Sequence, residues 1–204
     1  MNLVDIFPAT IGVTELLSLT PELMAAARSL IDADCANNAV AGDGCYTREQ
    51  QLLELPLFAP VKQEILGCCR EFAAAHSHVV EDIIICNSWG NVVNQGENIR
   101  YHLHNNAYIC GSLYLSDGSA FNLLNQHHAN LFNFAPAKLP GNNYRAMDSF
   151  TITPKPGRLI LFPANLMHCV LPSTSAARRY SVAFNTMPIG QLGSATSLMV
   201  LRAP

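Results

Sequence analysis

Three histidines have the spacing expected of a metal site. His102 and His104 are separated by one residue, so on a β-strand both side chains point to the same face and can hold one metal ion from one side. A third ligand has to come from elsewhere, and His168 follows a predicted strand at residues 158–162 that can return it to the same place. Three imidazoles leave coordination positions open, which indicates chemistry rather than a closed structural site.

A second group of polar residues lies in a strand of alternating pattern near the C-terminus. One face of this strand would carry Arg179, Ser181 and Ala183, and the other Tyr180, Val182 and Phe184. A buried arginine beside a hydroxyl is a suitable clamp for a carboxylate, because guanidinium offers a planar fork of donors and the hydroxyl adds one more. Arg178, one residue earlier, is expected to face away.

Six short motifs occur in order along nearly the whole chain. They lie at residues 6–10, 88–91, 96–104, 110–114, 157–168 and 179–185. In this order the motifs resemble those of the iron(II)- and 2-oxoglutarate-dependent oxygenases, and most closely those of a small bacterial and phage branch. The wider superfamily has His-x-Asp or His-x-Glu where this chain has His102 and His104, whereas that branch often has His-x-His. If His104 were not a ligand, Glu97 would be the nearest acid.

The resemblance implies an enzyme that uses iron(II), 2-oxoglutarate and O2, with no catalytic side chain beyond the metal centre. The three histidines would hold the iron. The residues implied to bind 2-oxoglutarate are Arg179 and Ser181 at its distal carboxylate, Asn91 at its C1 carboxylate, and Tyr114 beside it. Polar and aromatic residues near the His-x-His pair are expected at the substrate mouth, namely Tyr101, Asn105, Asn106 and Tyr108. They suit a polar small molecule and a peptide side chain equally, and hydroxylation is the expected outcome.

The same histidine segments also resemble the two cupin motifs, which leaves a second interpretation open. Cupins share the jelly-roll architecture and include three-His thiol dioxygenases, isomerases and metal-binding modules without catalysis. The chain lacks a Glu soon after the His-x-His pair, and Pro172 stands where cupins have an Asn after the distal His. Arg179 with Ser181 favours the oxygenase, since a cupin that does not use 2-oxoglutarate needs no such clamp.

The sequence pattern predicts a mainly β fold with N-terminal helices. Helices are expected at residues 20–31, 47–55 and 61–76, the first after the capping sequence Thr20-Pro21-Glu22. Short strands are expected at residues 83–86, 99–104, 108–115, 150–153, 158–162, 167–171, 179–186 and 198–201. This many short strands predicts a double-stranded β-helix, a cupin-like jelly roll closed around a cavity.

The length of 204 residues predicts a single domain, residues 1–204. Residues 1–80 would form a helical bracing segment, and residues 81–204 the jelly-roll core. A long stretch at about residues 116–149 has no consistent period and is expected to be a loop that acts as a lid or contacts a partner. His127 and His128 within it are expected to be solvated rather than metal ligands.

Composition limits the class of partner and the location. Hydrophobic residues make up 50% and charged residues 13% of the chain, which favours a homodimer that covers part of the surface. The net charge of −3 disfavours nucleic-acid binding. The N-terminus does not resemble a signal peptide, no segment is apolar for the length of a membrane span, and the 7 scattered cysteines are typical of reduced thiols. A cytoplasmic protein is expected.

Overall fold

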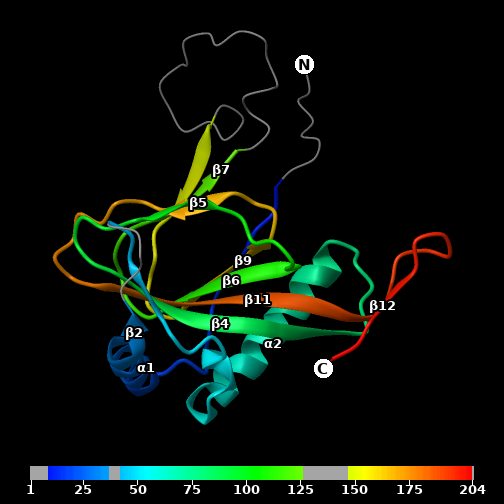
Figure 1. Ribbon diagram of the computed structural model, residues 1–204, viewed down its shortest axis with the longest axis horizontal. Helices are drawn as coiled ribbons and strands as arrows, with labels where there is room; N and C mark the ends of the chain where they lie inside the picture. The colour runs from blue at the N-terminus through cyan, green and yellow to red at the C-terminus, as the bar shows by residue number, and fades with distance from the viewer. Residues whose placement is uncertain (1–8, 37–41, 126–146, 204) are drawn as a thin grey trace, which may run out of the picture.

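Two antiparallel sheets face each other, and two helices pack on the outer side of the larger sheet (Figure 1). The structure is a computed structural model that describes residues 9–36, 42–125 and 147–203. In the larger, eight-stranded sheet the order is β1-β9-β6-β11-β4-β3-β2, with β12 paired to β11. In the smaller, four-stranded sheet it is β5-β10-β7-β8. The expected double-stranded β-helix with N-terminal helices is confirmed.

The element bounds follow the chain in order. The helices are α1 (Pro21–Asp34) and α2 (Ala59–Ala75), with single 3-10 turns at Leu52–Glu54 and Pro56–Phe58. The larger sheet contains β1 (Gly12–Glu15), β2 (Cys35–Ala36), β3 (Cys45–Thr47), β4 (Asp82–Val93), β6 (Ile109–Tyr114), β9 (Arg158–Pro163), β11 (Arg179–Leu192) and β12 (Met199–Leu201). The smaller sheet contains β5 (Ile99–His102), β7 (Phe121–Leu124), β8 (Ser149–Ile152) and β10 (His168–Val170).

The first and third predicted helices are confirmed, and the second is wrong. At the start of α1 the Thr20 hydroxyl accepts a hydrogen bond from the Leu23 amide, 3.2 Å away, which satisfies one of the unpaired amides of the first turn. Residues 47–55 form no α-helix, because Thr47 is the last residue of β3 and is paired with Cys35 of β2. Within residues 47–55 the structure has one 3-10 turn, Leu52–Glu54, and a second turn begins at Pro56.

The segment expected only to brace the sheet also contributes strands to it. Strands β1, β2 and β3 come from the first 80 residues and form the outer strands of the larger sheet. The expected loop at 116–149 contains β7, which pairs with β8 and β10. His127 and His128 lie outside the described residues. Sheet edges are completed by short strands whose pattern is too brief to detect in sequence.

The alternation in β11 divides its side chains between two environments, as predicted. Tyr180, Val182 and Phe184 pack into the core between the larger sheet and the helices. Arg179, Ser181, Ala183 and Asn185 line a cavity on the opposite face, between the two sheets. Successive residues of this part of β11 therefore face the core and the cavity in turn, as the two-residue period of the sequence predicts.

All 7 cysteines are free thiols, and each is buried or half-buried, as expected from their scattered positions. Within the part of the chain that the structure describes, no helix is both long enough and apolar enough to cross a membrane.

Candidate metal centre and co-substrate site

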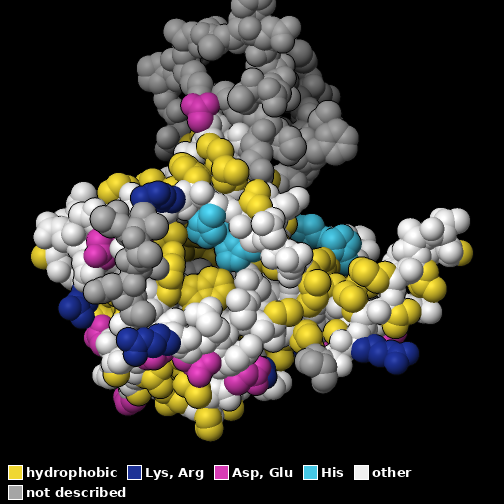
Figure 2. Space-filling model, viewed as in Figure 1, with side chains coloured by type: hydrophobic (Ala, Val, Ile, Leu, Met, Phe, Trp, Pro, Cys, Tyr) yellow, Lys and Arg dark blue, Asp and Glu magenta, His cyan; other side chains and the backbone are white. Residues whose placement is uncertain are grey.

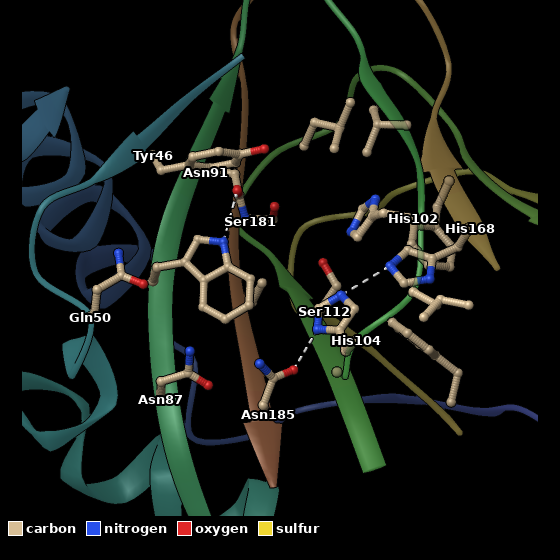
Figure 3. A pocket seen from close by; sticks show the side chains of 18 of the residues that line it. Tyr46, Gln50, Asn87, Asn91, His102, His104, Ser112, His168, Ser181 and Asn185 are labelled. Carbon is tan, nitrogen blue, oxygen red and sulfur yellow. Dashed lines mark hydrogen bonds between the residues drawn. The ribbon is translucent and has the colours of Figure 1, made fainter. Parts of the chain in front are cut away.

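Three histidine rings meet at one end of the cavity between the sheets (Figure 3). His102 ends β5 and lies directly opposite His168, the first residue of β10, in the antiparallel register. His104 lies two residues beyond His102, past the end of β5, where its amide donates to the Ala164 carbonyl oxygen, 3.0 Å away. The ring centroids are 4.3 Å apart for His102 and His168, and 5.1 Å apart for each pair that includes His104. The prediction that these three residues come together is consistent with this geometry.

The hydrogen bonds of the three rings leave one free nitrogen on each. Nδ1 of His102 lies 2.7 Å from the Arg100 carbonyl oxygen, and Nδ1 of His168 lies 2.8 Å from the Leu166 carbonyl oxygen. Nδ1 of His104 lies 2.5 Å from Oδ1 of Asn185. A carbonyl oxygen can only accept, so each Nδ1 carries the proton and each Nε2 presents a lone pair.

The free nitrogens face one another, which is the arrangement that a cation stabilises. Nε2 of His104 lies 3.2 Å from Nε2 of His168, and one ligand atom from each histidine lies within 4.8 Å of those of the other two. Two facing lone pairs cannot hydrogen-bond to each other, whereas both can bind a metal ion placed between them. The residues present therefore fit a metal ion that prefers imidazole, a group that includes iron, nickel and zinc.

Burial keeps two of these rings neutral. Removal from water lowers the pKa of His168 to about 3 and lowers the pKa of His104, in each case because burial disfavours the imidazolium form. The hydrogen bonds to Leu166 and Asn185 oppose this effect. Since only neutral imidazole binds a metal ion, both rings are in the binding form at neutral pH.

A buried guanidinium lies in the same cavity. Arg179 is 1% exposed, its Nη1 donates to the Ser181 hydroxyl 3.2 Å away, and its Cζ lies 5.0 Å from the centroid of the Tyr114 ring. The Arg179 Nε and the Tyr114 hydroxyl are both buried without a hydrogen-bond partner, and no ion pair joins Arg179 to an acid among the described residues. Burial lowers the pKa of Arg179. A buried cation with unused donors fits an anionic ligand.

Asn91 and the wall of the cavity complete the site. Asn91 is opposite Ser181 in the register of β4 and β11, and its Oδ1 accepts a hydrogen bond from Nε1 of Trp89, 3.1 Å away. The cavity has a volume of about 400 Å³ and reaches from the histidines to Arg179. Figure 2 shows His side chains beside a hollow on this face of the molecule.

Several cavity residues were not singled out from the sequence. They are Tyr46, Gln50, Asn87, Ser112 and Asn185, which line the same cavity as the histidines (Figure 3). Asn87, Trp89 and Asn91 alternate along β4, so their shared face could have been found from the period of two. No comparable signal exists for Tyr46 or Gln50, which reach the cavity from β3 and the turn that follows it.

Of the four residues expected at the substrate mouth, only Asn105 lines the cavity. Tyr101 is 47% exposed and its hydroxyl donates to Oδ1 of Asn122, 2.5 Å away. The Tyr108 hydroxyl lies 2.6 Å from Nδ1 of His78, and Asn106 is in a turn with φ of 60°. Glu97 does not line the cavity either. Its carboxylate accepts hydrogen bonds from the backbone and side chain of Asn94.

Gly118 lies against the base of the Arg179 side chain and gives a testable prediction. It has φ of 143°, and a Cβ built on it would lie 2.6 Å from the Cβ of Arg179. Gly118→Ala should therefore displace Arg179 and weaken 2-oxoglutarate binding by about tenfold, equivalent to about 1.4 kcal/mol. Isothermal titration would measure this. Gly67→Ala, on α2 where a Cβ meets nothing within 4 Å, is the matched control. Unchanged affinity in Gly118→Ala would contradict the prediction.

Comparisons with known proteins give a family match for one segment and a shared fold. Residues 87–185 match the family described as putative 2OG-Fe(II) oxygenase. No curated protein matches the chain. Among solved structures, it is similar to the non-heme alpha ketoglutarate dependent carbocyclase SnoK from nogalamycin biosynthesis, with a TM-score of 0.65 and 12% identity over 89% of this chain and 81% of that one.

Two further structures are similar over most of their length. One is HygX from Streptomyces hygroscopicus with nickel, 2-oxoglutarate and hygromycin B bound, with a TM-score of 0.60 and 16% identity over 88% of this chain and 83% of that one. The other is a prolyl-4-hydroxylase from Pseudomonas putida, with a TM-score of 0.60 and 15% identity over 87% of this chain and 92% of that one. The matched segment contains all three histidines, Arg179 and Ser181. Over this segment the chain is similar to the putative 2OG-Fe(II) oxygenases, and over most of its length it has the fold of the solved structures named above.

Proposed function

We propose that this protein is an iron(II)- and 2-oxoglutarate-dependent dioxygenase that hydroxylates an uncharged, polar substrate. The observation that carries the proposal is the content of one cavity. That cavity holds three imidazoles with converging free nitrogens and a buried guanidinium for which the described residues supply no carboxylate. A metal site alone would need no such guanidinium.

In this proposal, His102, His104 and His168 hold iron(II), and Arg179 with Ser181 binds the distal carboxylate of 2-oxoglutarate. The hydroxyl of Tyr114, which has no partner, would donate to the same carboxylate, and Asn91 would donate through Nδ2 to the C1 carboxylate. The iron would supply the redox chemistry with O2 that converts 2-oxoglutarate to succinate and carbon dioxide and oxidises a substrate C–H bond. The overall reaction adds one oxygen atom to the substrate and one to succinate.

The remaining cavity wall argues for a substrate without charge. Arg179 is the only Lys, Arg, Asp or Glu among the described residues that line the cavity. The cavity wall carries the neutral amides of Gln50, Asn87 and Asn105. A charged group buried there would lose its hydration without gaining a partner, whereas hydroxyl or amide groups could hydrogen-bond to these side chains.

Both kinds of substrate expected from the sequence remain compatible with this wall. One similar structure contains hygromycin B, a small molecule, and another is a prolyl-4-hydroxylase. The homodimer and the cytoplasmic location also stay predictions, the second supported by the seven free thiols. Absence of nucleic-acid binding stays a prediction from the net charge of −3.

Anaerobic titration of the iron-loaded protein with 2-oxoglutarate tests the proposed function. Chelation by 2-oxoglutarate should produce a saturable metal-to-ligand charge-transfer band in the visible spectrum, since the keto acid binds the iron directly. Succinate, which lacks the keto group, is the matched control and should give no band. If 2-oxoglutarate gave no band and did not bind, the cupin interpretation, a three-His metalloprotein that does not use 2-oxoglutarate, would replace this one.

A further inference from the structure

His104 is held differently from the other two histidines. His102 and His168 each donate Nδ1–H to a backbone carbonyl oxygen two residues earlier in the chain. Such a carbonyl is present whatever residue carries it. His104 donates instead to a side chain, Oδ1 of Asn185, which is 81 positions away in the sequence. The orientation of this one ring therefore depends on the identity of a single distant residue.

Asn185 is itself oriented by the sheet. It lies on β11 between Asn87 of β4 and Cys110 of β6, immediately before the bulge at Asn185 and Thr186. Cys110 Sγ donates to Oδ1 of Asn185, 3.1 Å away. This oxygen is therefore an acceptor from both sides, and it points toward His104 at the edge of the cavity (Figure 3). Bulges commonly re-aim a side chain in this way.

The other contacts of His104 do not select which nitrogen faces the metal. Its ring stacks on Trp89, with centroids 5.9 Å apart and planes 22° apart. A half-turn of the imidazole about its Cβ–Cγ bond would keep this stacking but would exchange the positions of ring nitrogens and carbons. His104 lies beyond the end of β5, and the hydrogen bond from its amide to the Ala164 carbonyl holds the backbone without selecting an orientation of the ring. The acceptor at Asn185 is what distinguishes the two orientations.

We propose that Asn185 is a positioning residue that holds His104 with Nε2 toward the metal ion. This inference rests on the proposed metal site. Asn185 acts through His104 and needs only an acceptor oxygen at this position, so a carboxylate of the same shape should replace it. An aspartate would also bring a negative charge next to His104, which raises the basicity of this imidazole as a ligand.

Metal binding by variants of Asn185 tests the proposal without any turnover. Trp89 is the single tryptophan of the chain, and it lies against His104, so its fluorescence should report the binding of Co²⁺ directly. Asn185→Ala should bind Co²⁺ about 10- to 100-fold more weakly than wild type, as is typical when the partner of a ligating histidine is lost. Asn185→Asp should bind Co²⁺ at least as tightly as wild type, and the absorption spectrum of its Co²⁺ complex should keep the wild-type form.

Asn87→Ala is the matched control, because Asn87 lies directly opposite Asn185, lines the same cavity and does not contact a histidine. It should bind Co²⁺ as wild type does. Wild-type affinity in Asn185→Ala would overturn the proposal, as would weak binding in a folded Asn185→Asp. If Asn185→Ala did not fold, the comparison of Asn185→Asp with Asn185→Ser, whose shorter hydroxyl cannot reach His104, would decide the question. Failure of wild type to bind Co²⁺ would instead overturn the proposed metal site.

Discussion

His168→Ala should bind iron(II) more than a hundredfold more weakly than wild type. His168 is 3% exposed, lies opposite His102 in the strand register and presents Nε2 to Nε2 of His104, so its loss removes one of three converging ligand atoms. Loss of a residue that only supports a ligand costs about 10- to 100-fold, and loss of the ligand itself should cost more. Anaerobic competition with a chromophoric chelator would measure the change, and His102→Ala and His104→Ala should behave similarly.

The control for this set is His78→Ala. His78 lies past the end of α2, contacts the Tyr108 hydroxyl and does not line the cavity, so its replacement should leave iron affinity unchanged. Full iron occupancy in His104→Ala, with loss in the other two variants, would show that the three-His site is wrong. Glu97, the acid nearest in sequence, is engaged with Asn94 and offers no ready substitute.

Arg179→Leu should weaken 2-oxoglutarate binding by about thirty-fold to several thousand-fold while iron stays bound, corresponding to about 2–5 kcal/mol for a lost charge-assisted contact. Arg179 is buried, its Nε has no hydrogen-bond partner, and no acid among the described residues pairs with it. Leucine fills much of the same space without the charge, so the protein does not gain an unpaired buried group. Titration of the charge-transfer band in the iron-loaded variant would give the affinity.

Arg178→Leu is the neighbouring control. The Arg178 side chain is 57% exposed and pairs with Asp32, 3.1 Å away, on the helix side of the larger sheet. This variant should keep the wild-type affinity for both iron and 2-oxoglutarate. If Arg179→Leu lost stability but its folded fraction bound 2-oxoglutarate normally, Arg179 would be structural and the oxygenase proposal would lose its main support.

The sequence predicted the candidate metal ligands and most strands because both predictions depend on short-range patterns. A period of two around Arg179 places it on the face opposite Val182, and the structure confirms the division into cavity and core. The His102 and His104 pair and the strand before His168 are equally local. The predicted helix at 47–55 was wrong because Thr47 pairs with Cys35 of a two-residue strand, a contact that outweighs the local helical pattern.

Only the tertiary structure determines how the side chains of the histidines and of Arg179 are oriented. The opposition of His102 and His168, the close approach of Gly118 to the base of Arg179 and the hydrogen bond from His104 to Asn185 each join segments far apart in the chain. Such contacts depend on strand register, where a shift of one residue would turn every side chain to the other face. Register is fixed by the packing of both sheets and the helices together, so no single segment of the sequence specifies it. The sequence thus predicted the three histidines, Arg179 and Ser181, which the structure brings to one cavity, and the packing of distant strands set the distances between them.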